Sequence, residues 1–415
     1  MSSLEKMGIA AKQAATSLAV AGTRDKNSAL AAIANALENG RRIIIEANDD
    51  DIARAKASGM SVAMLDRLTL TDKRITQMID GIMEIISFND PIGEVISMST
   101  NPSGLTIGKK RVPLGVIAII YESRPNVTVD AAALCLKAGN SVILRGGKEA
   151  ISSNIALTSL MRDAIDSVGL PSDIVALVED TSRQSARELM ELSGYVDVLI
   201  PRGGAGLIRS VVDNARVPVI ETGVGNCHIY VDADANLEMG AEIIFNAKCS
   251  RPSVCNTAET LLVDRKIASA FLPMAKTLLD KYDTELRGDE ETVAILGNCV
   301  TPATDDDYYR EFLDYILAVK VVDGVDEAID HIRKYSSGHS EAIVTENYTK
   351  AMRFINTVDS AAVYINASTR YTDGGEFGLG AEIGISTQKM HARGPMGLRE
   401  LTSSKYVIYG NGQVR

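Results

Sequence analysis

A cysteine in a polar, loop-like segment is the residue whose surroundings in the sequence best suit chemistry. Cys255 lies within residues 246–260, a polar stretch that precedes an apolar run. A loop cysteine becomes a nucleophile when nearby cations or backbone N–H groups favour its thiolate. Lys248, Arg251 and the backbone amide of Asn256 are close enough in sequence to do this. The sequence therefore predicts a reactive thiol at Cys255.

Any one cysteine, taken alone, is more often a small buried hydrophobe than a nucleophile. The chain has five of them: Cys135, Cys227, Cys249, Cys255 and Cys299. Their number is odd, no two form a CxxC pair, and the four histidines are far apart. Neither a disulfide framework nor a zinc site is indicated by this pattern. We therefore expect reduced thiols, as in a cytoplasmic protein, and no bound metal.

The composition is that of a globular protein long enough for two or three domains. The chain has 415 residues, of which 46% are hydrophobic, and a formal net charge of −11. Nucleic acids and anionic membranes require a basic surface, so this charge argues against both as partners. The densest apolar run, at residues 112–121, is too short to span a bilayer, and residues 1–6 lack the apolar core of a signal peptide.

Two kinds of hydrophobic pattern divide the chain. Residues 4–88 are rich in alanine and have apolar residues three and four positions apart, which predicts a helical subdomain. From residue 114 onward, short apolar runs alternate with helical patterns, which is typical of parallel sheets covered by helices. The first sheet is predicted to have five strands, at residues 114–121, 141–145, 174–178, 196–200 and 217–221. A second sheet is predicted from strands at residues 258–263, 316–322, 341–345 and 361–366.

Residues 97–113 and the tail at residues 404–409 have strand-like patterns but no place in either predicted sheet. The first segment contains an Asn-Pro-Ser-Gly turn at residues 101–104, which predicts a projecting hairpin. Because exposed strand edges are usually covered, we expect both segments to pair between subunits of at least a dimer. The alternative is pairing within one subunit.

Two glycine-rich turns that carry cations follow strands of the first sheet. No GxGxxG sequence follows its first strand, so the usual dinucleotide-binding fingerprint is not supported. A glycine-rich turn still lets backbone N–H groups approach a phosphate while a cation supplies charge. The candidate phosphate ligands in these turns are Arg145, Gly147, Lys148, Gly203 and Gly204. The alternative interpretation of each turn is a solvated connection.

Longer motifs carry a resemblance that covers essentially the whole chain. They are RVPLGVI (residues 111–117), YESRPNV (121–127), LKAGNSVILRGGK (136–148), VIETGVGNCH (219–228), VCN (254–256), VYIN (363–366) and EFGLG (376–380). Together they resemble the aldehyde dehydrogenase superfamily and, within it, the family that reduces L-glutamyl 5-phosphate. The resemblance implies an α/β, aldehyde dehydrogenase-like fold with a Rossmann-type cofactor domain, an α/β catalytic domain and a protruding oligomerisation hairpin. The implied division is an NADP-binding domain at residues 1–97, 113–225 and 368–397, a catalytic thiol domain at 226–367, and an oligomerisation arm at 98–112 and 398–415.

The resemblance assigns catalytic roles to three residues. Cys255 would be the nucleophile, and Asn126 would help to stabilise the thiohemiacetal oxyanion. Glu221, 34 positions before Cys255, aligns with the general base of the superfamily. An acylating reductase does not hydrolyse its thioester, so a proton relay or a structural contact is an equally good interpretation of Glu221.

The resemblance also implies an anionic substrate. The sequence Arg124-Pro125-Asn126 stands where the superfamily usually has Pro-Trp-Asn, and the added cation suits a negatively charged ligand. Arg251, Asn256 and His339 are further candidate substrate contacts. For His339 the alternative interpretation is an ordinary surface histidine.

The implied cofactor is NADPH. Lys148 stands where NAD-preferring members place an acid on the adenosine ribose, and Arg145 occupies the position of the family's usual lysine. Two cations there would favour a 2′-phosphate. Glu311 lies roughly where the superfamily holds the nicotinamide ribose, although the usual Phe-Gly-Pro after it is missing.

The implied reaction is the NADPH-dependent reduction of L-glutamyl 5-phosphate to L-glutamate 5-semialdehyde and phosphate through a cysteine thioester, in proline biosynthesis. A functional association with glutamate 5-kinase and a homodimer or larger assembly would accompany it. The alternatives are another acylating or hydrolytic aldehyde dehydrogenase, and an inactive structural homologue. Retention of Cys255, Asn126 and Glu221 together argues against the inactive homologue.

Overall fold

The computed structural model describes the backbone of residues 1–415 and every side chain apart from those of Val62 and Ala63. The chain forms two compact units. Unit 1 consists of Met1–Thr222, Gly378–Gly384 and Met396–Arg415, and unit 2 of Gly223–Phe377 and Ile385–Pro395. Residues 223–225, 368–377 and 385–395, which the resemblance places in the cofactor domain, thus group with unit 2. The functional division of the chain stays a prediction.

The helical pattern of the first 88 residues is confirmed. It comprises α1 (Ser3–Leu18), α2 (Thr23–Asn39), α3 (Arg41–Ala57), α4 (Val62–Leu68) and α5 (Asp72–Ser87). Polar caps set several of their starts, as at α1, where the Ser2 hydroxyl accepts from the Glu5 N–H at 3.2 Å and Glu5 accepts from the Ser2 N–H in return. The buried residues of α5 recur three and four positions apart, which gives this helix one apolar face.

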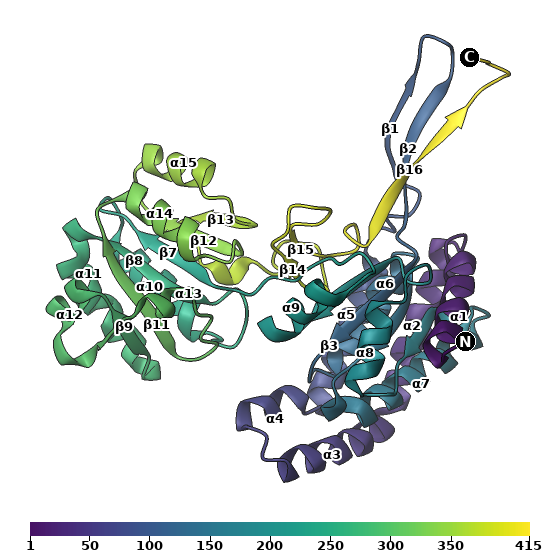
Figure 1. Cartoon of the computed structure of the whole chain (residues 1–415), viewed down its shortest axis with the longest axis horizontal. Helices are drawn as coiled ribbons and strands as arrows, with labels where there is room; N and C mark the ends of the chain where they lie inside the picture. The colour runs from purple at the N-terminus through teal and green to yellow at the C-terminus, as the bar shows by residue number, and fades with distance from the viewer. The chain divides into compact units, whose positions relative to one another are not determined.

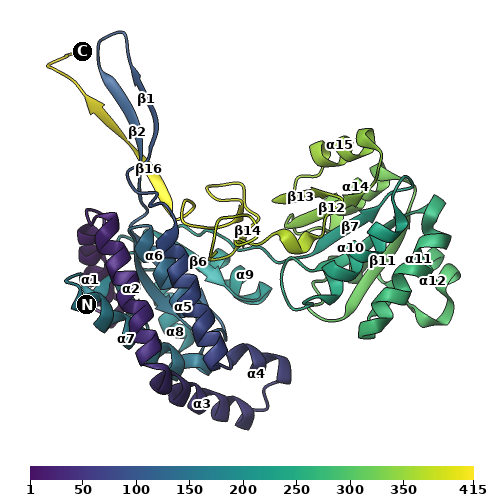
Figure 2. The same cartoon turned by 180° about the vertical axis from the view of Figure 1, so that it is seen from behind.

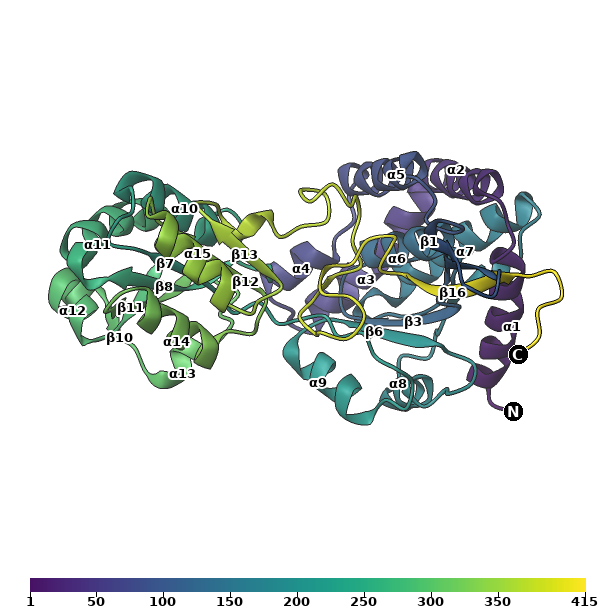
Figure 3. The same ribbon diagram turned by 90° about the horizontal axis from the view of Figure 1, so that it is seen from above.

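The sheet of unit 1 is parallel, with strand order β5-β4-β3-β6. Its strands are β3 (Val116–Tyr121), β4 (Ser141–Arg145), β5 (Val175–Leu177) and β6 (Val198–Arg202). The helices of this region are α6 (Asn126–Lys137), α7 (Ile151–Ser167), α8 (Arg183–Met190) and α9 (Ala205–Asn214), with short 3-10 turns at Lys148–Ala150 and Ser172–Ile174. Alternate residues such as Ala118 and Ile120 face a cluster formed with α1, α8 and α9. Helices α6 and α7 contact the sheet and are covered in turn by α2 and α5, which run side by side in Figure 3.

The predicted fifth strand of this sheet, at residues 217–221, is wrong. Val219 makes only an isolated bridge with Leu199. The Leu199 N–H donates to the Pro218 carbonyl at 2.9 Å, and the Ile220 N–H donates to the Leu199 carbonyl at 3.0 Å. Pro218 has no N–H to extend the ladder, so the segment follows β6 briefly without becoming a strand.

The sheet of unit 2 is also parallel, in the order β10-β9-β11-β8-β7-β12-β13. Its strands are β7 (Cys227–Val231), β8 (Ala258–Asp264), β9 (Glu285–Gly288), β10 (Thr301–Pro302), β11 (Ile316–Val322), β12 (Ser340–Val344) and β13 (Ala362–Ile365). The four predicted strands are confirmed as β8, β11, β12 and β13, whereas β7, β9 and β10 were missed. The last two are too short for a clear period, and β7 follows a glycine-rich stretch without a separating turn.

Helices cover both faces of this second sheet, as Figure 3 shows. They are α10 (Leu237–Cys249), α11 (Arg265–Leu279), α12 (Glu290–Leu296), α13 (Asp305–Tyr309), α14 (Val325–Tyr335) and α15 (Tyr348–Thr357), with 3-10 turns at Asp280–Tyr282, Gly297–Cys299 and Thr369–Tyr371. Ile229 and Val231 of β7 pack in the core formed with α10 and α11, whereas Tyr230 between them packs with α14 and α15. Burial on both faces explains why these strands are almost uniformly apolar.

The predicted hairpin and tail form a third, antiparallel sheet that projects from unit 1 (Figures 1 and 2). Its strands are β1 (Val95–Thr100), β2 (Thr106–Pro113) and β16 (Thr402–Tyr409), in the order β1-β2-β16. The two segments that lacked a place in either predicted sheet thus pair with each other inside one chain. We call this sheet the arm. Strands β14 (Ile385–Ser386) and β15 (Gly394–Pro395) form a small ladder of their own in unit 2.

Within the described part of the chain, none of the helices combines the length and the apolar character that crossing a bilayer requires.

Candidate active site

Cys255 lies in the loop between α10 and β8 of unit 2 and is half-buried. Cys135, Cys227 and Cys249 are buried, whereas Cys299 is exposed. Partial exposure leaves a thiol reachable while neighbouring groups still control its charge. The predicted nucleophile is therefore in a suitable position, and its role stays a prediction.

Gly225 holds the backbone of the thiol loop. A Cβ atom added to Gly225 would clash with the carbonyl group of Cys255, so the two backbones touch and only glycine fits. Cys227, at the start of β7, donates its S–H to the same Cys255 carbonyl at 3.2 Å. Burial raises the pKa of the Cys227 thiol well above its usual value, so the thiol stays protonated and remains a donor.

Glu311 contributes to the same support. Its carboxylate accepts from the Gly225 N–H at 2.8 Å, which fixes the glycine that touches Cys255. The expected role of Glu311 at a nicotinamide ribose stays a prediction. In the structure Glu311 binds Gly225, which in turn touches the thiol loop at Cys255.

Lys248 does not serve the thiol as a free cation, contrary to the sequence-based expectation. Its ammonium group lies 2.6 Å from the carboxylate of Glu259 in β8, and both side chains are fully buried. Burial lowers the pKa of Lys248 and raises the pKa of Glu259 to about 7. The Leu313 N–H donates to the other Glu259 oxygen at 3.2 Å. This pair belongs to the interior of unit 2.

Asn256 is committed to the scaffold through its side chain, which is almost completely buried. Its amide donates to the Arg370 carbonyl at 3.2 Å and to the Thr372 carbonyl at 2.9 Å, and its oxygen accepts from the Arg370 guanidinium. These bonds link the thiol loop to the segment after β13. The expected substrate contact of Asn256 stays a prediction. Arg251, the other predicted contact of the loop, is exposed.

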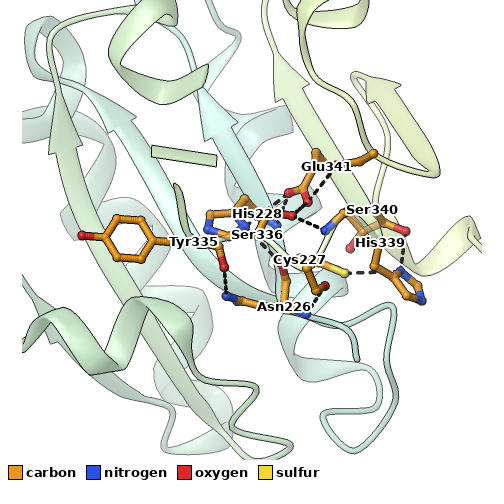
Figure 4. Close-up of polar contacts among 12 residues, drawn as sticks. Asn226, Cys227, His228, Tyr335, Ser336, His339, Ser340 and Glu341 are labelled. Atoms are coloured by element: carbon orange, nitrogen blue, oxygen red, sulfur yellow. Dashed lines mark hydrogen bonds and ion pairs between the residues drawn. The ribbon is translucent and has the colours of Figure 1, made fainter. Parts of the chain in front are cut away.

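His339 is fully buried, so its interpretation as a surface histidine is wrong. Figure 4 shows its ring beside Cys227, with Nδ1 3.6 Å from the Cys227 sulfur and 2.8 Å from the Ser340 hydroxyl. Ser340 in turn bonds to the Thr372 hydroxyl at 2.7 Å. Burial lowers the pKa of His339 to about 4, which makes the ring neutral near pH 7. Its candidate substrate contact stays a prediction.

The remaining polar groups of Figure 4 hold the start of β7 to β12 and to the segment before it. The buried Glu341 carboxylate accepts from the His228 N–H at 2.7 Å and from the Ser336 hydroxyl. The Asn226 amide donates to the Tyr308 carbonyl at 2.7 Å and to the Tyr335 carbonyl at 2.8 Å. The polar residues of the motif at residues 219–228 are thus used largely for structure.

In unit 1, Asn126 stands at the start of α6 and donates its side-chain N–H to the Asp130 carboxylate at 2.9 Å. These two residues line a small cavity together with Arg124, Arg202 and Glu382. Burial raises the pKa of Asp130 to about 6, while the Asn126 hydrogen bond and the Arg202 charge oppose that rise. The sequence reasoning missed Asp130, although its i+4 spacing from Asn126 places it on the same helix face. Glu221 is half-buried in unit 1, and its role stays a prediction.

The first glycine-rich turn exposes only one of its two cations to solvent. Lys148 is exposed at the start of the 3-10 turn after β4. Arg145 is half-buried and donates to the carbonyls of Thr181 at 2.7 Å and Ser182 at 3.0 Å, and burial lowers the pKa of its guanidinium. A Cβ added at Gly147 would meet the Glu149 carboxylate, which lies at the end of a flexible side chain. Lys148 is therefore the better placed cation.

The second glycine-rich turn faces a carboxylate that the sequence reasoning missed. The Gly204 N–H donates to Glu122 at 2.9 Å, and a Cβ added to Gly203 would lie 2.6 Å from the same carboxyl group. A carboxylate repels a phosphate, so this placement does not favour Gly203 and Gly204 as phosphate ligands. Glu122 directly follows β3, the position that could have drawn attention to it.

Comparison with known proteins places the chain in a family. The model of the aldehyde dehydrogenase family matches residues 2–303. The chain belongs to the aldehyde dehydrogenase family. It is 61% identical over 405 residues, 98% of this chain and 97% of the relative, to a gamma-glutamyl phosphate reductase of Carboxydothermus hydrogenoformans. It is 57% identical over 415 residues, the full length of both chains, to the protein of the same name from Listeria monocytogenes.

Solved structures agree with this assignment to the aldehyde dehydrogenase family. The crystal structure of gamma-glutamyl phosphate reductase from Thermotoga maritima matches with a TM-score of 0.97, at 51% identity, over 100% of both chains. A Rhodopseudomonas palustris propionaldehyde dehydrogenase, at 16% identity and a TM-score of 0.71, shares the fold. The expected aldehyde dehydrogenase-like α/β fold is thereby confirmed.

We expect the free energy of unfolding of Asp130→Asn, relative to that of the wild type, to increase as the pH rises from about 4 to about 7. The folded-state pKa is about 6 and the unfolded value is about 3.9, so in that window the folded chain binds more protons and its stability falls with rising pH. Asparagine can still accept from Asn126 and cannot ionise. Urea unfolding midpoints of both proteins at pH 5, 6 and 7.5 should diverge accordingly.

Asp163→Asn, which changes an exposed carboxylate of α7, supplies the background for this comparison. If the urea midpoints of Asp130→Asn and the wild type differ by the same amount at all three pH values, the raised pKa of Asp130 is contradicted.

Proposed function

We propose that the chain catalyses the reduction of L-glutamyl 5-phosphate to L-glutamate 5-semialdehyde and phosphate. The observation that carries the proposal is the half-buried Cys255 in a loop fixed at Gly225 and Asn256. It stands in a chain 57–61% identical over nearly its whole length to proteins named gamma-glutamyl phosphate reductase. A thiol placed in this way can form a covalent acyl intermediate.

The proposed reaction begins with attack of the Cys255 thiolate on the acyl carbon. The carbon–oxygen bond to the phosphoryl group breaks, phosphate departs with the bonding electrons, and a thioester remains on Cys255. A nicotinamide cofactor, when bound, would supply the hydride that reduces this thioester. The resulting thiohemiacetal releases the semialdehyde and regenerates the thiol.

Three further residues have proposed roles in this reaction. Asn126 would donate to the oxygen that gains negative charge, and Asp130 would orient its amide through their 2.9 Å hydrogen bond. No water is activated in the reductive direction. Glu221 is therefore proposed as a proton relay or a structural contact rather than a hydrolytic base.

Cys255→Ala should lower turnover by more than about 10³-fold, because no other residue can carry the acyl group. The measurement is phosphate-dependent NADP⁺ reduction with glutamate 5-semialdehyde, which runs the proposed reaction backward. Cys249→Ala, which removes a buried thiol of the same segment, is the matched control and should keep most of the activity.

Near-normal turnover by Cys255→Ala would remove the basis of the proposal. Aldehyde oxidation that requires coenzyme A, or that proceeds equally well without phosphate, would instead favour another acylating or a hydrolytic activity.

We propose NADPH as the cofactor, with Lys148 as the main contact of its 2′-phosphate. Lys148 is exposed at the carboxyl end of β4, whereas Arg145 is held by the carbonyls of Thr181 and Ser182 and supports the turn. Cofactors of open α/β sheets bind beyond these strand ends. The position and charge of Lys148 therefore suit an anionic group of the cofactor.

Lys148→Glu should raise the KM for NADPH by about 10-fold to 100-fold, the range expected for loss of a charge-assisted contact, and change the KM for NADH much less. Lys73→Glu makes the same charge change at an exposed position of α5 and should alter neither value. Equal losses for both cofactors would show that Lys148 does not recognise the 2′-phosphate.

We also propose that the arm joins this chain to a second copy. Strands β1 and β16 are the outer strands of the arm, and all six residues of β1 are exposed. The exposed apolar side chains on these strands are Val95, Ile96, Met98, Tyr406, Ile408 and Tyr409. Open strand edges that carry apolar residues are a site for pairing between chains. A functional association with glutamate 5-kinase, as the source of the acyl phosphate, belongs to the same proposal.

Deleting residues 404–415 should convert an assembly of at least two chains into monomers or aggregates, because it removes most of β16. Light scattering at micromolar concentration measures the change. Deletion of residues 411–415 leaves β16 complete and is the matched control. A full-length protein that is monomeric at this concentration would overturn the proposal.

A further inference from the structure

Arg370 is a charged residue tied directly to the thiol loop. It lies in the 3-10 turn Thr369–Tyr371, within the same unit as Cys255. Its guanidinium donates through Nη1 to the Asn256 side chain and through Nε to the Ser250 hydroxyl at 3.1 Å. The two acceptors stand on either side of Cys255 in the sequence. Arg370 is thus held against the loop at both flanks of the thiol.

This position is fixed in both directions. While Arg370 donates to the oxygen of Asn256, the Asn256 amide donates back to the Arg370 carbonyl at 3.2 Å and to the Thr372 carbonyl at 2.9 Å. The Thr369 hydroxyl donates to the Asn256 carbonyl at 2.7 Å. Because the Arg370 backbone and guanidinium are both held by Asn256, the Arg370 side chain loses little conformational entropy when it binds a ligand.

The charge of Arg370 lacks a carboxylate partner among the described ion pairs. Both hydrogen-bond acceptors, Asn256 and Ser250, are neutral. By contrast, Arg287, also partly buried in unit 2, pairs with Glu285 at 2.9 Å and Asp307 at 2.7 Å. A partly buried cation without such compensation favours the arrival of an anion.

The charged groups around Arg370 reinforce this preference. Burial lowers the pKa of its guanidinium, and the positive charge of Arg251 lowers it further, while Asp373 and the thiols of Cys255 and Cys227 act in the opposite direction. The Asp373 carboxylate is used locally, since it accepts from the Gly375 N–H at 2.9 Å. Two arginines therefore share the neighbourhood of the thiol.

We infer that Arg370, assisted by Arg251, binds the phosphoryl group that leaves when Cys255 is acylated. Arginine matches phosphate because its planar N–H groups bind two oxygens at once, and the hydrogen bonds to Asn256 and Ser250 engage two of its five N–H donors. The inference rests on the proposed function and names the group that holds the leaving phosphate. The anchor points beside Cys255 favour the reacting end of the substrate over its distant carboxylate.

In the forward direction the two cations stabilise the charge that builds on the departing phosphate as the carbon–oxygen bond breaks. In the reverse direction they hold inorganic phosphate while one of its oxygens attacks the thioester carbon, the carbon–sulfur bond breaks, and the Cys255 thiolate leaves. Both directions need the same anion subsite.

The kinetic test uses the reverse reaction, in which phosphate, semialdehyde and NADP⁺ are varied separately. Arg370→Gln should raise the KM for phosphate by at least about 10-fold, the effect of losing a charge-assisted contact, and leave the KM values for semialdehyde and NADP⁺ within about 3-fold. Arg370→Lys, which keeps the charge, should recover part of the loss. A rise in the KM for semialdehyde alone, or a fall in kcat with an unchanged KM for phosphate, would overturn the inference.

A second measurement does not depend on turnover. Iodoacetamide labelling of Cys255 is followed in a Cys299→Ser background, with and without inorganic phosphate at matched ionic strength. Phosphate should protect the thiol in the chain with Arg370 intact and fail to protect it in Arg370→Gln. Equal protection in both would overturn the phosphate subsite. An intact chain without phosphate-dependent NADP⁺ reduction would refute the proposed function, and the labelling result would still decide the subsite.

Discussion

The contact between the backbones of Gly225 and Cys255 is the constraint on which the rest of the thiol loop depends. No side chain separates the two segments, so the loop lies in direct backbone contact with the residues that lead into β7. Glu311 holds the glycine from one side, and Cys227 binds the Cys255 carbonyl from the other. The position of the sulfur is therefore set by a parallel sheet buried on both faces rather than by the loop itself, as a precise reacting geometry requires.

The same unit contains charges far from water. Lys248 and Glu259 form a fully buried pair, and Glu341 is buried against His228. Removing ions from water is expensive, and the mutual attraction offsets this only when hydrogen bonds satisfy the remaining lone pairs. Here the Leu313 N–H and the Ser336 hydroxyl supply such bonds. Each pair joins two particular elements of unit 2, α10 to β8 through Lys248 and Glu259, and β7 to β12 through His228 and Glu341.

The sequence could predict the parts of this structure that depend on local periodicity. The helices of the first 88 residues follow from apolar spacings of three and four, and most strands of the two parallel sheets follow from short apolar runs between helical patterns. The strand predictions failed where the local hydrophobic pattern does not match the strand pairing in the sheet. Residues 217–221 look like a strand, yet Pro218 limits them to one bridge, and the two-residue β10 is visible only through its neighbour β9.

The candidate site shows the same division. Cys255 was found from its own neighbours in the sequence. Arg370 lies 114 positions from Asn256, its hydrogen-bond partner, so nothing local could connect it to the thiol loop. The expectation for Lys248 failed for the opposite reason. Lys248 is near Cys255 in sequence, but its side chain extends from the last turn of α10 to Glu259. Glu122 and Asp130 were missed because a carboxylate beside a glycine turn or on a helix face has no distinctive pattern.

The register of the arm has a consequence for the synthesis of the chain. Thr402 pairs with Pro113 and Tyr409 with Thr106, so β2 receives its second neighbour only from residues about 290 to 300 positions later in the chain. During translation the β1–β2 hairpin is complete about 290 residues earlier, with one edge of β2 unsatisfied while the ribosome makes everything between. Unpaired strand edges on nascent chains are prone to wrong pairing. Lys109 and Lys110 lie on β2 and place positive charge on this strand while its edge is unpaired. Charged side chains discourage wrong strand pairing, and this protection is no longer needed once β16 has paired with β2.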